Sequence, residues 1–273
     1  KIYDCLMKYE NKNTKVKLII NKKNLGLTKS LNKAISKSNG KYIARMDADD
    51  ISFPKRLEKE IKKIKNEKLD MVFSKKINID ESGDIIGKRD FFNLNPKEVR
   101  KILPMKNIVT HPSVMIRKEI FDNLKGYRMI DTAEDYDFWL RMLNENYKIG
   151  LINQYLIYYR VRRNSISQSN LSKQKFTAIF LRNSYRQKKY NFENINSNNN
   201  YFNEQEIKKF DIAFDYYKKG MYLIRKYRFL SGIINIFKSL FTHKMIRYLI
   251  LNKFKYRTFL LMKKNKKQLI GWL

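Results

Sequence analysis

The fold class is indicated by one stretch, Tyr42-Ile43-Ala44-Arg45-Met46-Asp47-Ala48-Asp49-Asp50. Its beginning, Tyr42 to Met46, reads as a buried strand, and three carboxylates follow directly. Pro54 favours the start of a helix after them, and apolar residues at helical spacing predict another helix before them, from Leu27 to Ile35. Alternating strands and helices are typical of a helix-covered parallel sheet. We therefore expect an α/β fold with a mixed, mainly parallel sheet.

The same alternation continues along the chain. Further strands are expected at Val16 to Asn21, Met71 to Ser74, Ser113 to Ile116 and near Ile149 and Tyr155 to Arg160, with an amphipathic helix from about Glu134. The Asn- and Ser-rich stretch 191–203 is the best linker candidate. We expect three parts: a catalytic domain over residues 1–167, a helix and linker over 168–203, and a basic amphipathic helical tail over 204–273.

Charge is spread unevenly over the 273 residues. The net charge is +33, of which residues 1–159 carry +12 and residues 160–273 carry +21, and no carboxylate follows Asp215. Such a tail indicates a polyanionic partner, either nucleic acid or an anionic lipid surface. A lysine-rich composition bias is the alternative, but it does not explain the missing carboxylates.

Composition also bears on location. The single cysteine, Cys5, cannot form an internal disulfide and fits a reducing cytoplasm. No apolar run approaches the ~18 to 20 residues that cross a bilayer. We expect a soluble or peripheral protein.

The acidic group Asp47, Asp49 and Asp50 is the strongest chemical signal. Ligands of an open parallel sheet bind at the carboxyl ends of its strands, and carboxylate oxygens suit Mg²⁺ or Mn²⁺, which take further ligands from substrate phosphates. The alternative is a set of solvated turn residues that cap the next helix. Asp50 fits either a metal ligand or that helix cap.

A second acidic group, Glu134-Asp135-Tyr136-Asp137, opens the amphipathic helix. The helix dipole alone favours acids in a first turn. Together the two groups suggest more, because a carboxylate beside a metal-bound diphosphate can take a proton from an acceptor hydroxyl. Phe138 and Trp139 are expected in the core.

An ordered set of motifs resembles the family 2, GT-A type inverting glycosyltransferases of bacterial surface-polysaccharide synthesis. The resemblance covers roughly residues 15 to 167. It rests on these segments: Asn24-Leu25-Gly26-Leu27, Gly40 to Asp50, Pro54-Lys55-Arg56-Leu57, Thr110-His111-Pro112-Ser113-Val114-Met115 and Glu134-Asp135-Tyr136-Asp137-Phe138-Trp139-Leu140-Arg141.

The resemblance implies a Rossmann-like GT-A fold and a role for each matching residue. Asp49 corresponds to a metal ligand for Mg²⁺ or Mn²⁺, and Asp47 to a residue near both metal and ribose. Asp135 corresponds to the general base and Glu134 to its neighbour, while His111 lies on the acceptor side unless it is only a turn residue. The donor side would comprise Asn24, Gly26, Arg45, Asp47, Arg160 and Arg163.

Two departures from the family pattern stand out. Arg163 replaces a histidine of the closing segment; arginine binds phosphate but cannot ligate a metal, and a solvated turn is the alternative. The family's first two nucleotide-binding strands are also absent, and the chain opens at Lys1 in what resembles the following helix. We therefore expect an N-terminally truncated glycosyltransferase domain.

These observations predict transfer of a sugar from a nucleotide-diphosphate sugar to a hydroxyl of a glycan or lipid-linked acceptor, with inversion. The tail predicts a peripheral position on the anionic inner face of the cell membrane; a helical hairpin packed on the domain is the alternative. The alternative function is that of an inactive glycosyltransferase remnant kept as a membrane scaffold. A nucleic-acid-binding protein is not expected, since no known nucleic-acid motif is visible.

Overall fold

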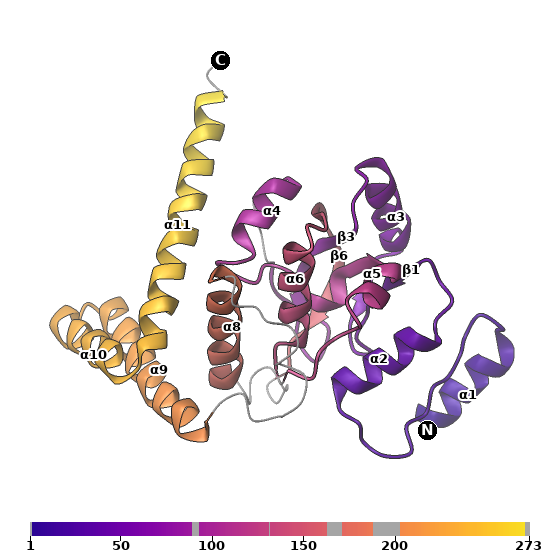
Figure 1. The fold of residues 1–273 in the computed structure, drawn as a ribbon, viewed down its shortest axis with the longest axis horizontal. Helices are drawn as coiled ribbons and strands as arrows, with labels where there is room; N and C mark the ends of the chain where they lie inside the picture. The colour runs from indigo at the N-terminus through magenta and orange to yellow at the C-terminus, as the bar shows by residue number, and fades with distance from the viewer. Residues whose placement is uncertain (1, 89–92, 131, 163–170, 188–202, 271–273) are drawn as a thin grey trace.

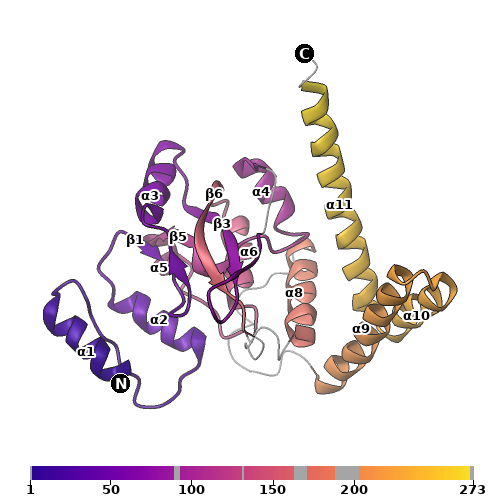
Figure 2. The ribbon, with the colours of Figure 1, turned by 180° about the vertical axis from the view of Figure 1, so that it is seen from behind.

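The computed structural model describes residues 2–88, 93–130, 132–162, 171–187 and 203–270. A mixed sheet with its covering helices forms the middle of the molecule (Figure 1). The N-terminal helices α1 (Ile2–Lys12) and α2 (Leu27–Lys37) lie on one side of it. The helices α9 (Glu204–Arg225), α10 (Phe229–Thr242) and α11 (Lys244–Ile270) lie on the other, and the view from behind shows the same order (Figure 2).

The sheet has the strand order β1-β5-β3-β6-β2, with β4 paired to β3. The strands are β1 (Tyr42–Ala44), β2 (Ile51–Ser52), β3 (Met71–Ile79), β4 (Ile85–Lys88), β5 (Val114–Arg117) and β6 (Ile149–Arg160). Only β3 and β6 pair in parallel, while the other four described pairs are antiparallel. The α/β class is as expected, but the prediction of a mainly parallel sheet is wrong for these strands. After β3 the chain turns back into β4, and β5 also runs antiparallel to β3.

Most expected elements are present with changed limits. Residues 16–21 form no strand, since none of the described strands pairs with them. The two expected strands near residues 149 and 155–160 are one continuous β6, and the acids after β1 lead into the short β2. The remaining helices are α3 (Arg56–Asn66), α4 (Pro96–Ile102), the 3₁₀ turn η1 (His111–Ser113), α5 (Lys118–Asn123), α6 (Glu134–Asn144) and α8 (Leu171–Arg186).

The main core is built around α6. Phe138 and Trp139 are fully buried, as predicted from their helical spacing, and β3 contributes Met71 and Phe73 to the same cluster. Nine of the eleven residues of α6 are buried, so this helix is enclosed by its neighbours. Burial of this kind holds the first turn of α6, with its acidic residues, rigidly against the sheet.

The helical tail has a core of its own. Phe210 and Phe214 of α9 pack with Phe176 of α8 and Ile246 of α11. Helix α8 joins this cluster to the main core, because its Phe180 packs against both. The tail is therefore partly a helical assembly packed on the domain, which was one of the two predicted alternatives.

Among the described helices, none combines the length and the apolar character that a bilayer crossing requires.

Candidate active site

One large cleft contains most of the predicted site residues. It has a volume of about 1870 Å³ and lies between the sheet edge, η1, the start of α6 and the tail helices. Residues from both acidic groups line it, although they are separated by more than 80 positions in the sequence. The predicted residues on its wall are Arg45, Asp47, Asp49, His111, Glu134, Asp135 and Arg160.

Two predicted donor-side residues that the structure describes are not brought to this wall. Asn24 and Gly26 form the turn that starts α2, where the Asn24 side chain accepts a hydrogen bond from the Gly26 amide (2.9 Å). The cleft is instead lined by the next two residues, Leu27 and Thr28. Arg163 lies outside the residues that the structure describes.

The first acidic group sits on the turn between β1 and β2. Asp47 and Asp49 are partly exposed to the cleft, with side-chain exposures of 36% and 33%. Each meets one arginine: Arg45 pairs with Asp47, and Arg162 Nε lies 2.9 Å from Asp49 Oδ2. Both carboxylates therefore have a guanidinium partner in this structure.

Asp50 has a different place from its two neighbours. It is buried, and its Oδ1 accepts a hydrogen bond from the backbone amide of Arg160 in β6 (2.9 Å). Its Oδ2 is buried without a partner among the described residues. Burial raises the pKa of Asp50 from 3.8 to about 6, which the Arg160 amide opposes. The predicted helix cap is wrong, because Lys55 is the N-cap residue of α3 and no side chain caps that helix.

The donor set can be compared with what Mg²⁺ or Mn²⁺ needs. No group of three His, Cys, Asp or Glu side chains in the described part of the chain could hold a metal alone. Asp47 and Asp49 offer two carboxylates at an open cleft, with the orphaned Oδ2 of Asp50 on the same turn. Magnesium is commonly held by one or two carboxylates together with substrate phosphates. The residues fit a metal that arrives with a diphosphate, not a closed metal site.

A buried ion pair in α3 supports the turn between β1 and β2. Arg56 Nε lies 2.8 Å from Glu60 Oε1, and Arg56 Nη2 donates to the Arg45 carbonyl oxygen (2.8 Å) at the end of β1. Glu60 is fully buried and its Oε2 has no described partner. Burial raises the pKa of Glu60 from 4.5 to about 7, and the charge and hydrogen bond of Arg56 lower it only in part. In the sequence, the spacing of Arg56 and Glu60 by one helical turn is the pattern that indicates this ion pair.

Asp135 lies in the first turn of α6, three residues after Thr132, whose backbone is strained. Thr132 has a φ of +68°, which is uncommon for a non-glycine residue and marks places where the surrounding structure enforces a conformation. The Asp135 side chain then accepts a hydrogen bond from the amide of Tyr136 (2.6 Å). The positive end of the helix dipole faces this carboxylate.

The protonation of Asp135 is tuned by its surroundings. Burial raises its pKa from 3.8 to about 6, while the Tyr136 amide, the Arg45 charge and a hydrogen bond from Asn107 lower it. At neutral pH the group is still mainly ionised, yet it is a stronger base than an ordinary aspartate. Such a value suits a general base. Asn107 carried no recognisable signal in the sequence.

His111 lies between the acidic first turn of α6 and a buried tyrosine. Its Nε2 is 2.9 Å from the Tyr127 hydroxyl, and its Nδ1 is 3.8 Å from Glu134 Oε1. Burial lowers the pKa of His111 well below its usual value, and Arg45 lowers it further. The imidazole is therefore neutral at pH 7 and adds polar atoms, not positive charge, to this wall of the cleft. Tyr127 was not singled out from the sequence.

Asp137 belongs to the second acidic group but not to the cleft. It is fully buried, and its Oδ2 is 2.9 Å from Nε of both Arg128 and Arg141. Arg141 also donates to the carbonyl oxygens of Leu124 and Gly126. This network fastens α6 to the segment after α5, so that Asp135 is presented from a fixed helix.

The Arg160 side chain donates hydrogen bonds to backbone carbonyl oxygens of the protein. Its Nε donates to the Asp49 carbonyl oxygen (2.9 Å), and its Nη1 donates to the carbonyl oxygens of Asp80 and Glu81. It thereby ties the acidic turn to the β3–β4 connection. Its predicted contact with a diphosphate stays a prediction.

Known proteins similar to this chain point to one family. Residues 2–125 match the family described as glycosyl transferase family 2. An uncharacterized glycosyltransferase of Methanocaldococcus jannaschii is 34% identical over 197 residues, which cover 71% of this chain and 68% of that protein. The O-antigen biosynthesis glycosyltransferase WbnJ of Escherichia coli is 38% identical over 148 residues, covering 54% of this chain and 58% of WbnJ.

The fold is also found in solved structures. A crystal structure of residues 1–349 of S. aureus TarS has a TM-score of 0.52 at 15% identity, covering 97% of this chain and 78% of that one. At that identity the likeness shows the GT-A type fold alone. The relative of M. jannaschii, at 34% identity over two thirds of its length, shows the family. The chain belongs to glycosyltransferase family 2.

Proposed function

We propose that this chain carries the site of a nucleotide-sugar glycosyltransferase that transfers a sugar, with inversion, to a hydroxyl of a glycan or lipid-linked acceptor. The observation that carries the proposal is that Asp47, Asp49 and Asp135 line one cleft. The first two are open carboxylates on a turn, and the third is a base with a raised pKa. A donor diphosphate and an acceptor hydroxyl need these two environments side by side.

Asp49 and Asp47 would hold Mg²⁺ or Mn²⁺ together with the diphosphate of the donor. The metal would supply charge that stabilises the departing diphosphate. Arg45 pairs with Asp47 and lowers the pKa of Asp135, so its charge is felt at both acidic groups. Arg45 would neutralise part of the charge of the donor diphosphate.

Asp135 would take the proton of the acceptor hydroxyl. The acceptor oxygen then forms a bond to the anomeric carbon on the face opposite the diphosphate, and the bond from that carbon to the diphosphate oxygen breaks. The diphosphate leaves with the electron pair and the configuration inverts. Glu134 and the neutral His111 would contact the acceptor, since they lie beside Asp135 on the same wall.

The acceptor and the location of the protein are part of the same proposal. WbnJ is named for O-antigen biosynthesis, which supports a cell-surface polysaccharide as the product. The chain spans a little over half of WbnJ and of the putative glycosyltransferase EpsE of Bacillus subtilis, so the activity of the whole protein is included in the proposal. The basic tail supports a position at the inner face of the cell membrane.

The experiment compares Asp135→Asn with Asp49→Asn in this protein. Donor binding is measured by calorimetry with UDP or GDP and Mn²⁺, and transfer by nucleoside diphosphate release from a panel of nucleotide sugars. UDP-GlcNAc comes first, because TarS was solved with it. We expect Asp135→Asn to lower transfer by about 10²- to 10⁴-fold without changing nucleotide affinity, and Asp49→Asn to weaken metal-dependent nucleotide binding.

The matched control is Asp84→Asn, an exposed aspartate outside the cleft; it should change neither quantity. Wild-type transfer by Asp135→Asn would contradict the base role. Equal loss of nucleotide affinity in Asp135→Asn and Asp49→Asn would contradict the division between donor and acceptor sides.

A further inference from the structure

Helix α10 has a row of large apolar side chains on the outside. Gly232 and Ser239 are its buried residues, whereas the large apolar residues facing away are 46% to 79% exposed. These residues recur at helical spacing and form one face. We call them the α10 stripe: Leu230, Ile233, Ile234, Phe237 and Phe241. In an ordinary surface helix the large apolar residues face the core. In α10, Ile236 and Leu240 do so, and the stripe is a second apolar face that points away from the core.

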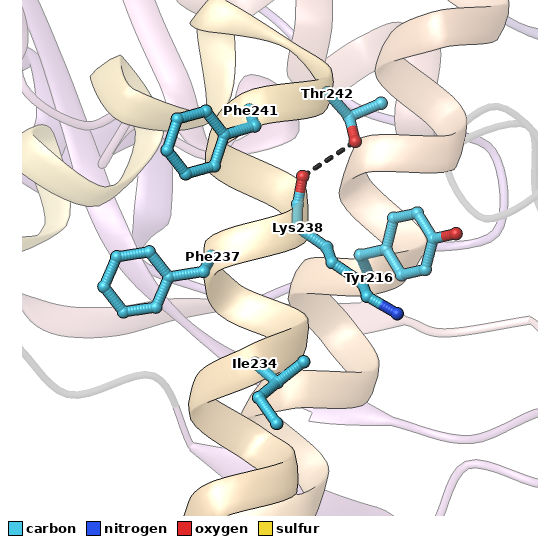
Figure 3. Close-up of a pocket in the computed structure, with 6 residues that line it drawn as sticks. All are labelled: Tyr216, Ile234, Phe237, Lys238, Phe241 and Thr242. Atoms are coloured by element: carbon cyan, nitrogen blue, oxygen red, sulfur yellow. Dashed lines mark hydrogen bonds between the residues drawn. The ribbon is translucent and has the colours of Figure 1, made fainter.

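The close approach of α10 to α9 explains this orientation. A Cβ on Gly220 of α9 would lie 2.8 Å from the Gly232 carbonyl oxygen, and one on Gly232 would lie 2.6 Å from Ile224 Cγ1. The two helices therefore meet nearly backbone to backbone through glycines. Figure 3 shows Phe237 and Phe241 on the side of α10 away from Tyr216 of α9. Packing on α9 holds the stripe outward.

The surroundings of the stripe are cationic. Lys238 lies within α10, and its ammonium approaches the Tyr216 ring (6.0 Å to the centroid) beside an open apolar hollow of about 610 Å³. Further exposed cations precede and follow the helix: Arg225, Lys226, Arg228, Lys244 and Arg247. No carboxylate occurs anywhere after Asp215. Cations therefore predominate around the stripe, although α9 brings Glu206 Oε2 to 3.3 Å from Nε2 of His243, the C-cap residue of α10.

We infer that the α10 stripe inserts into the interface of a membrane that contains anionic lipids. An exposed apolar patch of this kind marks an interaction surface, and an apolar face with a cationic rim is typical of helices that lie in a lipid interface. A second copy of this chain is a poorer occupant, because two copies that meet at the stripe would bring their cationic rims together. The inference rests on the membrane attachment proposed above and names the surface responsible.

The test uses the full chain and vesicles of phosphatidylcholine with or without phosphatidylglycerol. We expect binding to the anionic vesicles that salt weakens but does not abolish, since screening acts over about 10 Å at 0.1 M salt whereas apolar burial is not screened. Phe237→Ser with Phe241→Ser should weaken binding by about 100-fold, on the order of tenfold for each inserted aromatic side chain. Lys226→Gln with Lys238→Gln should reduce binding by about fivefold per charge and flatten the salt dependence.

The matched controls use two adjacent isoleucine pairs. Ile233→Ser with Ile234→Ser removes part of the stripe, whereas Ile85→Ser with Ile86→Ser removes a somewhat more exposed pair on β4. Only the first change should weaken vesicle binding, while circular dichroism and thermal unfolding stay as in the wild type. Binding that survives loss of the stripe would place membrane contact elsewhere and overturn the inference.

Three further outcomes would also overturn it. Absence of any vesicle binding would contradict membrane attachment itself, while transfer to a soluble acceptor would still test the catalytic proposal separately. A dimer in light scattering that the stripe variants dissociate, without an effect on vesicles, would make the stripe a protein interface. Binding to RNA in place of anionic vesicles would assign the cationic rim to nucleic acid.

Discussion

The two acidic groups look alike in the sequence but differ in how the protein supports them. In each group one buried carboxylate is an anchor held by distant residues: Asp50, at the edge of the cleft, in the first group and Asp137, away from the cleft, in the second. Asp137 is met by two arginines. Asp50 receives one backbone amide and keeps a buried oxygen without a described partner.

This difference in support indicates a different chemical role for each group. The second group is charge-compensated in its anchor and offers a single tuned base, Asp135. The first is under-compensated: both Asp50 and Glu60 beneath the turn have pKa values raised by burial. A buried carboxylate oxygen without a described partner, next to two open carboxylates, favours the arrival of a cation at the first group, whereas the buried carboxylate of the second group already has two arginine partners.

The largest expected effect concerns the anchor of the second group. Asp137→Asn leaves Arg128 and Arg141 buried with less compensation, and breaking a buried pair from one side costs about 3 to 5 kcal/mol. Urea unfolding should show this loss. Glu145→Gln, an exposed carboxylate next to the end of the same helix, should stay within about 0.5 kcal/mol of wild type. A loss below about 1 kcal/mol in Asp137→Asn would remove the contrast between the two groups.

A smaller effect should appear in the pH dependence of Glu60→Gln. The folded-state pKa of Glu60 is raised from 4.5 to about 7, so its contribution to stability is full below pH 4.5 and is lost as the pH rises through 7. Glutamine cannot ionise. As the pH rises from 5 to 8, the free energy of unfolding of the variant should therefore increase relative to that of the wild type, by up to about 3 kcal/mol.

Unfolding by urea at both pH values measures this gain, with the exposed Glu58→Gln on the same helix as control. A variant that instead loses stability toward pH 8 would mean that attraction between ionised Glu60 and Arg56 outweighs burial. The first group would then be as well compensated as the second.

The smallest effect is expected at the surface of the first group. Arg162 is 55% exposed and pairs with Asp49, and exposed ion pairs contribute about 0.2 to 1 kcal/mol. Arg162→Gln should free Asp49 and tighten binding of Mn²⁺ alone by no more than about fivefold at low salt. Electron paramagnetic resonance titration measures this, with the exposed Lys88→Gln as control. Weaker Mn²⁺ binding in Arg162→Gln would argue against Asp49 as a metal ligand.

Much of the local architecture could be predicted from the sequence. The stretch 42–46 followed by acids predicted a strand and a turn, and helical spacing predicted α2, α6 and the burial of Trp139. The prediction that this strand is buried and reaches Met46 was wrong, because β1 ends at Ala44 and none of its residues is buried. The prediction at residues 16–21 was wrong, since a strand forms only where another strand can pair with it. Strand pairing joins residues far apart in the chain, so antiparallel β5 could not be predicted from local pattern either.

The sequence by itself determined the order of elements, the acidic residues that end up at the cleft and the cationic excess after Asp215, because these depend on residue type and spacing. Only the tertiary structure decided which carboxylates are anchors and which face the cleft, since burial and hydrogen bonds come from distant partners such as Arg160 for Asp50 and Arg128 for Asp137. It also decided that the apolar face of α10 points outward. That orientation follows from the contact of Gly220 with Gly232, which no single helix can specify alone.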